Sequence, residues 1–313
     1  ILVSRLRAAN MLLVGLKGVG AEVCKNVVLC GLKSLTLLDH SVVSDEDAFS
    51  QFLVCRTSVG KNRAEASVQR SAELNPNVKI IADTDNVENK PDEFFTTFDL
   101  VCVTCCNLQT MLRINDICRQ NKIKFLATDV FGYYGYMFSD LVDHEFVEEK
   151  AMVMKKDDEE TKKTKVEKTE TLTVKGSTKF CSLKDALNVD WKSEKLHKSL
   201  KKLSSVYFIM QVLLRFRGEI GRDPDREHLE DDCSKLLKIR DQIMEKIGVP
   251  KDKVGDDFAS VCAGELGPVC AVVGGIVGQE VIKAVSGKDA PHNNFFFFNG
   301  TESSGIVDQI GTC

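Results

Sequence analysis

A glycine-rich segment and a downstream acid are the residues in this sequence with the clearest chemical potential. The segment GLKGVG spans residues 15–20, and Asp39 ends the apolar run that follows. A glycine-rich turn at a helix N-terminus can cradle phosphate, and a carboxylate at the end of the next strand can bind a ribose hydroxyl. Lys17, however, stands where such a turn most favours glycine, because a long side chain fills the space that a phosphate needs. The motif predicts a nucleotide-type fold but argues against a working phosphate loop.

The elements that must position these residues alternate between strand and helix patterns. Met11–Val14 and Leu35–Leu38 are apolar runs of strand length, and between them lies an amphipathic stretch that ends at Gly31. Five further stretches have helical or strand spacing: Arg63–Leu74, Val78–Ala82, Asp99–Cys105, Leu108–Asn121 and Ile123–Thr128. This alternation predicts an α/β, Rossmann-like fold whose mostly parallel sheet is covered by helices on both faces.

Composition divides the chain into four parts. Residues 1–147 are expected to form the first part of the Rossmann-like domain. Residues 148–179 are almost all charged or small, which predicts a charged flexible linker. Residues 180–262 carry only helical patterns and predict a small inserted helical domain. Residues 263–313 complete the first domain, with three expected elements: a helix at Gly267–Ser286 and strands at Asn293–Asn299 and Gly305–Ile310.

The bulk properties exclude several classes of function. A net charge of −4 gives no broad basic field, so nucleic acid is not an expected partner. No membrane partner is expected either, because the longest apolar stretch, Pro268–Gly278, is glycine-rich and short. Most of the 12 cysteines lie in apolar runs, and the CxxC pair Cys102 and Cys105 has no second pair nearby. They are expected to be reduced, as in the cytosol or nucleus. The five histidines have no ligand spacing, so no metal site is predicted.

The linear order of several short motifs resembles one family. The motifs are GLKGVG, LLD at 37–39, QFL at 51–53, VGKNRAEAS at 59–67, LNP at 74–76 and the late GGIVGQEVIKA. Together they are similar to the adenylating half-enzymes of the ubiquitin-like activating enzymes, which are related to the bacterial ThiF and MoeB adenylyltransferases. FGYYGY, DHEFVEEK and PHNNFFFF resemble the smaller subunits of the heterodimeric SUMO-activating branch. The resemblance covers essentially the whole chain and implies a ThiF/MoeB-type adenylation fold.

The resemblance also implies where a nucleotide would bind in an active member. Such members adenylate the C-terminus of a small protein modifier with ATP and Mg²⁺, and then pass it to a cysteine. The ribose-binding Asp corresponds to Asp39 and is kept, whereas the middle glycine of the turn corresponds to Lys17. The Asn and Arg of an Asn-x-x-Arg pair fall at Asp47 and Ser50. The phosphate-binding Lys falls at Arg63.

The magnesium-binding Asp of active members falls at Cys106, which offers a soft thiol where a hard oxygen is needed. The resemblance therefore implies a vestigial pocket that binds no cofactor in this chain alone. Its expected members are Gly15, Lys17, Gly18, Gly20, Asp39, Arg63 and Cys106. ATP and magnesium are expected in the partner subunit instead.

A nucleophilic cysteine is not apparent in the inserted segment. Cys181 and Cys233 are the nearest candidates, and Cys233 follows two acids that would raise the pKa of its thiol. We expect no catalytic residue in this chain. A surface for a partner is expected instead at the aromatic motif and at the degenerate Asn-x-x-Arg loop. The expected residues are Gln51, Phe52, Phe131, Tyr133, Tyr134 and Tyr136, although the tyrosines could equally pack inside the chain.

Three functions remain open from the sequence. The favoured hypothesis is a non-catalytic subunit of a SUMO-activating heterodimer, in which the larger catalytic subunit performs the adenylation and thioester steps and the SUMO modifier is met through the complex. The resemblance implies an ATP-dependent ligase as the whole enzyme and a location in the nucleus, with some cytoplasmic protein. An active adenylyltransferase or dinucleotide-dependent oxidoreductase is the alternative, and the eroded turn and missing metal acid speak against it. An adaptor that binds the modifier by itself is the third.

Overall fold

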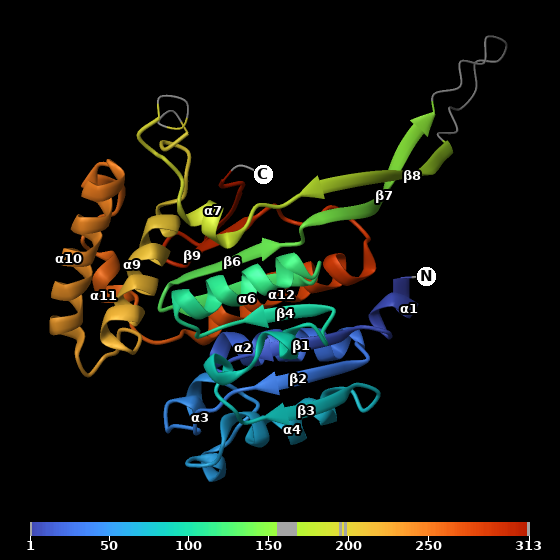
Figure 1. The fold of residues 1–313 in the computed structure, drawn as a ribbon, viewed down its shortest axis with the longest axis horizontal. Helices are drawn as coiled ribbons and strands as arrows, with labels where there is room; N and C mark the ends of the chain where they lie inside the picture. The colour runs from blue at the N-terminus through green and yellow to red at the C-terminus, as the bar shows by residue number, and fades with distance from the viewer. Residues whose placement is uncertain (1, 155–167, 194–195, 197–198, 312–313) are drawn as a thin grey trace, which may run out of the picture.

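A single mixed sheet forms the centre of the molecule. The computed structural model describes residues 2–154, 168–193, 196 and 199–311. Its sheet has eight strands in the order β10-β9-β6-β5-β4-β1-β2-β3 (Figure 1). The strands are β1 (Asn10–Val14), β2 (Ser34–Leu38), β3 (Lys79–Asp83), β4 (Leu100–Val103), β5 (Lys124–Phe131), β6 (Tyr134–Asp140), β9 (Phe295–Asn299) and β10 (Ser304–Asp308).

The sheet has a parallel half and an antiparallel half. Strands β3, β2, β1, β4 and β5 run parallel, as the alternation of helix and strand patterns predicts. Strands β5, β6, β9 and β10 pair antiparallel. The chain leaves β1 toward β2 and β3 on one side and returns to β4 on the other. This reversal of strand order places a crevice beyond the carboxyl ends of β1 and β4, where ligands of such sheets bind.

Helices cover both faces of this sheet. The longer helices are α2 (Gly18–Cys30), α4 (Arg63–Leu74), α6 (Leu108–Gln120), α9 (Ser205–Ile220), α10 (Leu229–Ile247) and α12 (Gly267–Ser286). The short ones are α1 (Leu2–Leu6), α3 (Asp47–Ser50), α5 (Asp92–Phe95), α7 (Leu183–Leu187) and α11 (Phe258–Val261), with 3-10 turns η1 (Arg56–Ser58), η2 (Val87–Asn89) and η3 (Lys251–Lys253). The expected bounds of α4 and α12 agree with the structure, and Gly31 ends α2 in the left-handed conformation.

Two hydrophobic cores follow from the alternation of side chains along each strand. Leu12 and Val14 of β1 belong to a core shared with α6, α9 and α10, whereas Met11 and Leu13 belong to a core shared with α2 and α12. Helix α12 is long and apolar enough to cross a membrane by length and composition, but 56% of that window is buried inside the molecule. It is a core helix that packs along α2.

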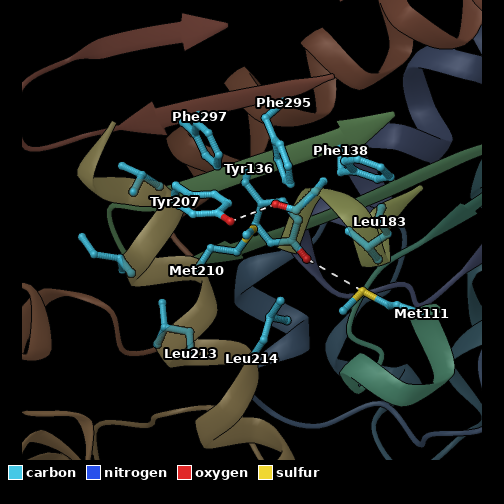
Figure 2. Close-up of a cluster of buried hydrophobic side chains, with 14 of the residues drawn as sticks. Met111, Tyr136, Phe138, Leu183, Tyr207, Met210, Leu213, Leu214, Phe295 and Phe297 are labelled. Atoms are coloured by element: carbon cyan, nitrogen blue, oxygen red, sulfur yellow. Dashed lines mark hydrogen bonds between the residues drawn. The ribbon is translucent and has the colours of Figure 1, made fainter. Parts of the chain in front are cut away.

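The helical segment packs directly onto the sheet. Tyr207 of α9 makes edge-to-face contacts with Phe295 and Phe297 of β9, at ring centroid distances of 6.0 and 6.2 Å. Its hydroxyl donates a 2.8 Å hydrogen bond to the carbonyl of Ala186 (Figure 2). Met210 lies beside it in the same cluster. The helices within residues 180–262 therefore share a core with the nucleotide-type sheet, although the division into an inserted domain remains a prediction.

The expectation of a flexible linker at 148–179 is wrong for the described part of that range. Strands β7 (Asp143–Met154) and β8 (Lys168–Lys179) pair antiparallel in a ribbon that extends away from the sheet (Figure 1). Phe146 lies over Gly176, directly opposite on the partner strand, and a Cβ there would meet its ring at 2.5 Å. Pairing between β7 and β8 stabilises this ribbon in place of a buried apolar core. Residues 155–167, the rest of the expected linker, lie outside the described residues.

Candidate functional site

A cleft of about 1580 Å³ opens beyond the carboxyl ends of the parallel strands. Gly15 and Lys17 follow β1, Asp39 follows β2, and Cys106 follows β4, so the topology brings these four sequence-predicted residues to one place. Arg63, at the start of α4, also lines the cleft. Helix α9 and the segment after α7 form the opposite wall. The cleft thus lies between the nucleotide-type sheet and the helical segment.

The glycines of the turn are explained by backbone packing alone. Gly15 has φ of +84°, and a Cβ there would lie 2.3 Å from the hydroxyl of Thr104, which itself donates to the carbonyls of Val14 and Gly15. A Cβ on Gly20 would lie 2.1 Å from the Gly15 carbonyl oxygen. Both positions need glycine so that strand, turn and helix can pack closely. Their presence therefore says nothing about a bound nucleotide.

Asp39, the position of the ribose-binding acid, is fully engaged by the chain itself. Its Oδ2 accepts hydrogen bonds from the backbone N–H of Leu16 at 2.9 Å and from Arg63 Nη1 at 3.0 Å. Its Oδ1 accepts from the N–H of Ser41 at 2.9 Å. Arg63 also binds Asp47 Oδ2, through Nε at 3.1 Å and Nη2 at 2.9 Å. Burial opposes the charge of Arg63, but Asp39 and Asp47 raise its pKa. A buried acid–arginine–acid triad replaces a ribose site.

A second buried network occupies the position expected for the metal-binding acid. Arg217 of α9 donates from Nη1 to the carbonyl of Cys106 at 2.7 Å and to Asp129 Oδ2 at 2.9 Å. Its Nε donates to Asp223 Oδ1 at 2.6 Å. Lys17 Nζ lies 3.6 Å from Asp223 Oδ2. The guanidinium is thereby held between two carboxylates and a carbonyl.

The ionisation of this network follows from burial and pairing. Burial raises the pKa of Asp129 despite the adjacent guanidinium. It also opposes the charge of Asp223, but Arg217 and Lys17 hold the pKa of that carboxyl below its ordinary value. The Cys106 thiol is buried, and this raises its pKa to about 12. Because a metal-binding cysteine must be a thiolate, this thiol is a poor ligand.

The N-terminus of α2, where a phosphate would bind, is met by a carboxylate from the chain. Oε2 of Glu265 accepts a 2.5 Å hydrogen bond from the backbone N–H of Gly18. Within α2, which the structure describes in full, the first turn has no acidic side chain and Lys17 caps no amide with its side chain. Glu265 therefore serves as the acid at this helix terminus. Burial raises the pKa of Glu265 to about 7, although Lys17 opposes the shift.

Mg·ATP does not fit these residues. Three cations that line the cleft, Lys17, Arg63 and Arg217, lie against carboxylates of the same chain. The cradle at the N–H of Gly18 holds Glu265. Among the described residues, no group of three or more His, Cys, Asp or Glu side chains is arranged to hold a metal ion. Binding a polyanion here would require several buried ion pairs to separate, each at a large cost.

Four of the six residues expected at a partner surface are buried in this chain. Gln51, Phe131, Tyr134 and Tyr136 are each no more than 5% exposed, so the expectation that they face a partner is wrong. Tyr134 and Tyr136 lie on the central strand β6, and the Tyr136 hydroxyl donates to Asp129 Oδ2 at 3.3 Å and approaches the sulfur of Met111 (Figure 2). The alternation of β6 between two covered faces leaves no side chain for solvent.

The other two expected residues are accessible, and further apolar side chains join one of them. Tyr133 is 42% exposed and Phe52 is 37% exposed. Phe49, at 72%, lies close to Phe52 in the chain. The segment from β2 to α4 also exposes Val42 and Val59. We call Val42, Phe49, Phe52 and Val59 the apolar loop surface.

Sequence reasoning missed Arg217, Asp129, Asp223 and Glu265. Arg217 could have been found from the sequence, because it falls seven residues after Met210, on the face of α9 whose other buried residues are apolar or aromatic. A charge at such a position needs a partner. Asp129 lies in an apolar strand and carried the same signal. Asp223 and Glu265 lie in loops, where acids are ordinary.

Comparison with known proteins agrees with this geometry at the level of the family. The ThiF family profile matches residues 2–310, and the chain belongs to the ThiF family. Within it, the chain is 52% identical to the SUMO-activating enzyme subunit 1 of Xenopus laevis, over 98% of this chain and 91% of that protein. It is 50% identical to the SUMO-activating enzyme subunit 1 of Homo sapiens, over 98% and 90%. The subunit 1 of Danio rerio is also 50% identical, over 98% and 90%.

Proposed function

We propose that this chain is the smaller, non-catalytic subunit of a heterodimeric SUMO-activating enzyme. The relatives described above are named as subunit 1 of that enzyme, at half identity over nearly the whole chain. The observation that carries the non-catalytic part is the pairing within the cleft, where Asp39, Arg63 and Arg217 each bind other groups of the same chain. A subunit of this kind contributes structure to an enzyme whose chemistry lies elsewhere.

The larger subunit then supplies what this chain lacks. It holds ATP and magnesium, adenylates the C-terminus of the SUMO modifier and carries the cysteine that forms the thioester. This chain binds no cofactor alone and meets the modifier through the complex. An active adenylyltransferase or an oxidoreductase would need an open phosphate cradle, whereas Glu265 accepts the hydrogen bond of Gly18 N–H here. The closed cradle disfavours both alternatives.

The apolar loop surface is the part of this chain that best suits the larger subunit. Phe49 and Phe52 project from the segment between β2 and α4, and cations lie over both rings: Arg56 at 4.7 Å from the Phe49 centroid and Lys25 at 5.5 Å from the Phe52 centroid. Exposed aromatic side chains beside arginine are the composition of interface centres. We assign the larger subunit, rather than the modifier, to this surface, because the proposed enzyme is a permanent pair.

Reconstitution tests this function directly. The chain and the larger subunit are purified together and separately, and modifier-dependent exchange of pyrophosphate into ATP is measured. We expect exchange only when the larger subunit is present, a 1:1 complex in native mass spectrometry, and no heat of Mg·ATP binding to this chain alone in calorimetry. Micromolar Mg·ATP binding by the isolated chain that is lost in Asp39→Ala, or a failure to pair with the larger subunit, would contradict the proposal.

We also propose that the protein acts in the nucleus, with a fraction in the cytoplasm. Support comes from the resemblance and from the basic run KKTK at 162–165, which lies outside the described residues. Imaging of the tagged chain with and without substitution of these lysines tests it. Uniform cytoplasmic signal in both would contradict the proposal.

A further inference from the structure

Three segments that are distant in the sequence converge on the degenerate nucleotide site. The C-terminal turn of α9 brings Arg217, the loop after it brings Asp223, and the loop before α12 brings Glu265. Arg217 and Asp223 belong to the helical segment, residues 180–262, and Glu265 lies just after it. The sheet side supplies Gly18, Cys106 and Asp129. The contacts across the cleft therefore join the helical segment to the nucleotide-type sheet at its switch point.

The loop that carries Glu265 is fixed against the FGYYGY motif. The backbone N–H of Gly132 donates to the Gly264 carbonyl at 2.6 Å, and the N–H of Tyr133 donates to the Val261 carbonyl at 3.0 Å. A Cβ on Gly132 would lie 1.9 Å from that Val261 oxygen, so only glycine allows this approach. The motif thus positions the loop, and with it the carboxylate on the N-terminus of α2.

The acidic side chain of Glu265 and the basic side chain of Arg217 have the same signs of charge as the phosphate and the metal ion of a bound nucleotide. A carboxyl oxygen of Glu265 accepts the hydrogen bond of Gly18 N–H at the N-terminus of α2, where a phosphate oxygen would accept it. A cation at the Cys106 carbonyl, held also by Asp129 and Asp223, is surrounded by oxygens of the kind that bind a divalent metal. The resemblance places the metal-binding acid of active members at Cys106, and Nη1 of Arg217 lies 2.7 Å from the carbonyl oxygen of this residue.

We propose that Glu265 and Arg217 are internal substitutes for the phosphate and the metal ion, and that they keep this cleft closed to phosphate-class anions. The site holds an acceptor at the N-terminus of α2 and a cation beside the Cys106 carbonyl without a ligand. The helical segment is thereby held on the sheet by hydrogen bonds from Arg217 to Cys106 and Asp129. This inference rests on the proposed non-catalytic role and gives it a mechanism.

Hydrogen exchange at the N-terminus of α2 tests the phosphate substitute. Peptide-resolved exchange is measured on the complex with the larger subunit for wild type, Glu265→Ala, Glu265→Gln and the control Glu302→Ala, whose side chain is exposed on another loop. A hydrogen bond to a charged group is lost in Glu265→Ala, so the Gly18 amide should exchange on the order of tenfold faster. Glu265→Gln keeps an acceptor and should preserve protection, and Glu302→Ala should match wild type.

Pyrophosphate is the probe that tests whether the cleft excludes phosphate-class anions. At millimolar concentration it should leave exchange at residues 17–21 of wild type and Glu265→Gln unchanged, and should restore protection in Glu265→Ala. Slower exchange of these residues in wild type with pyrophosphate would overturn the proposal, even if Glu265→Ala fails to fold. Unaltered exchange in a folded Glu265→Ala protein would overturn it as well.

The role of the Arg217 guanidinium is tested in the same way. Arg217→Met should speed hydrogen exchange across residues 217–225 by at least tenfold, and Arg217→Lys should recover part of the lost protection. Arg215→Met on the same helix should have no effect, and equal exchange in all three variants would overturn the assignment of Arg217 as the metal substitute.

These measurements are separable from the proposed function. If no complex forms with the larger subunit, the proposed function fails, while exchange of the full chain alone still decides whether the cleft is closed.

Discussion

The cleft and the apolar loop surface differ in whether their side chains find partners within the chain. At the strand ends of the cleft, Arg63 and Arg217 are buried and bind carboxylates of the same chain, as Arg63 does with Asp39 and Asp47. On the apolar loop surface, Phe49 and Phe52 are exposed to solvent. The chain satisfies the polar site internally and leaves apolar groups for a partner. This contrast is the one expected of the proposed non-catalytic subunit, whose cleft is structural and whose partner-binding groups lie on its surface.

The largest effect is expected when the cleft network loses its central cation. Arg217→Met should lower the free energy of unfolding by about 3–5 kcal/mol, because it leaves Asp129 and Asp223 buried without their partner. Thermal or urea unfolding of the complex measures it. Arg215→Met is the matched control, since Arg215 makes an exposed pair with Glu219 on the same helix and should cost less than about 1 kcal/mol. Equal losses in the two variants would mean that the network is not structural.

A smaller effect, confined to association, is expected at the apolar loop surface. The double substitution Phe49→Asp and Phe52→Asp should raise the Kd for the larger subunit by roughly 10- to 100-fold, because two apolar anchors become charged. It should change the stability of the chain little, as both side chains are exposed. Biolayer interferometry measures the affinity. Ile306→Asp on β10, at the far edge of the sheet, is the control, and comparable weakening there would place the interface elsewhere.

A pH-dependent effect of intermediate size should report on Glu265. Its pKa is raised from 4.5 to about 7, mainly by burial, with Lys17, Asp129 and Asp223 facing it. Below pH 4.5 the carboxyl is protonated in both the folded and unfolded chain. As the pH rises to 7, only the unfolded chain releases the proton readily, so this group favours unfolding increasingly.

Glu265→Gln should therefore stabilise the protein by about 1–2 kcal/mol at pH 8 and by nothing near pH 4.5. Urea denaturation across this range measures the difference. Glu302→Gln serves as the control for an exposed acid and should show no such trend. A stabilisation that is the same at both pH values would contradict the shift and its cause.

Much of the sheet could be predicted from local patterns, because the spacing of apolar residues in each strand and helix follows from which of its faces is buried. Arg63–Leu74 and Gly267–Ser286 show apolar or small residues at helical spacing, and both helices have these bounds. The ribbon of β7 and β8 was missed because its order depends on pairing between strands of charged residues. Composition alone cannot distinguish such a ribbon from a linker.

Only the site residues that directly follow predicted strands could be placed from the sequence. Lys17, Asp39 and Cys106 follow strands whose ends meet in the crevice, so their juxtaposition follows from the fold. Arg217 contacts Cys106 from 111 residues away and Glu265 contacts Gly18 from 247 residues away, and no local pattern encodes these contacts. The aromatic motif misled for a related reason. Tyr134 and Tyr136 read as interface residues by type, but the sheet position of β6 decides their burial.

The smallest effect is expected from the cysteines, if the thioester forms on the larger subunit. Cys233→Ala should leave the reducible modifier adduct of the complex unchanged, because burial and Asp232 raise the pKa of its thiol. Cys181 is buried, and its sulfur lies 3.1 Å from Nδ2 of Asn294. Cys181→Ala should therefore lower the melting temperature slightly through lost packing, with the same adduct at lower temperature.

Cys55 gives the most demanding version of this prediction. The hydroxyls of Ser58 and Thr57 lower the pKa of the Cys55 thiol to about 7, so it is the better nucleophile. It lies in the segment that bears the apolar loop surface, where assembly would cover it. We expect Cys55→Ala to preserve the adduct, and iodoacetamide to label Cys55 faster in the free chain than in the complex. If Cys55→Ala abolishes the adduct while gel filtration shows an intact heterodimer, then chemistry lies on this exposed segment, and the contrast between a cleft satisfied within the chain and a surface that only binds the partner is wrong.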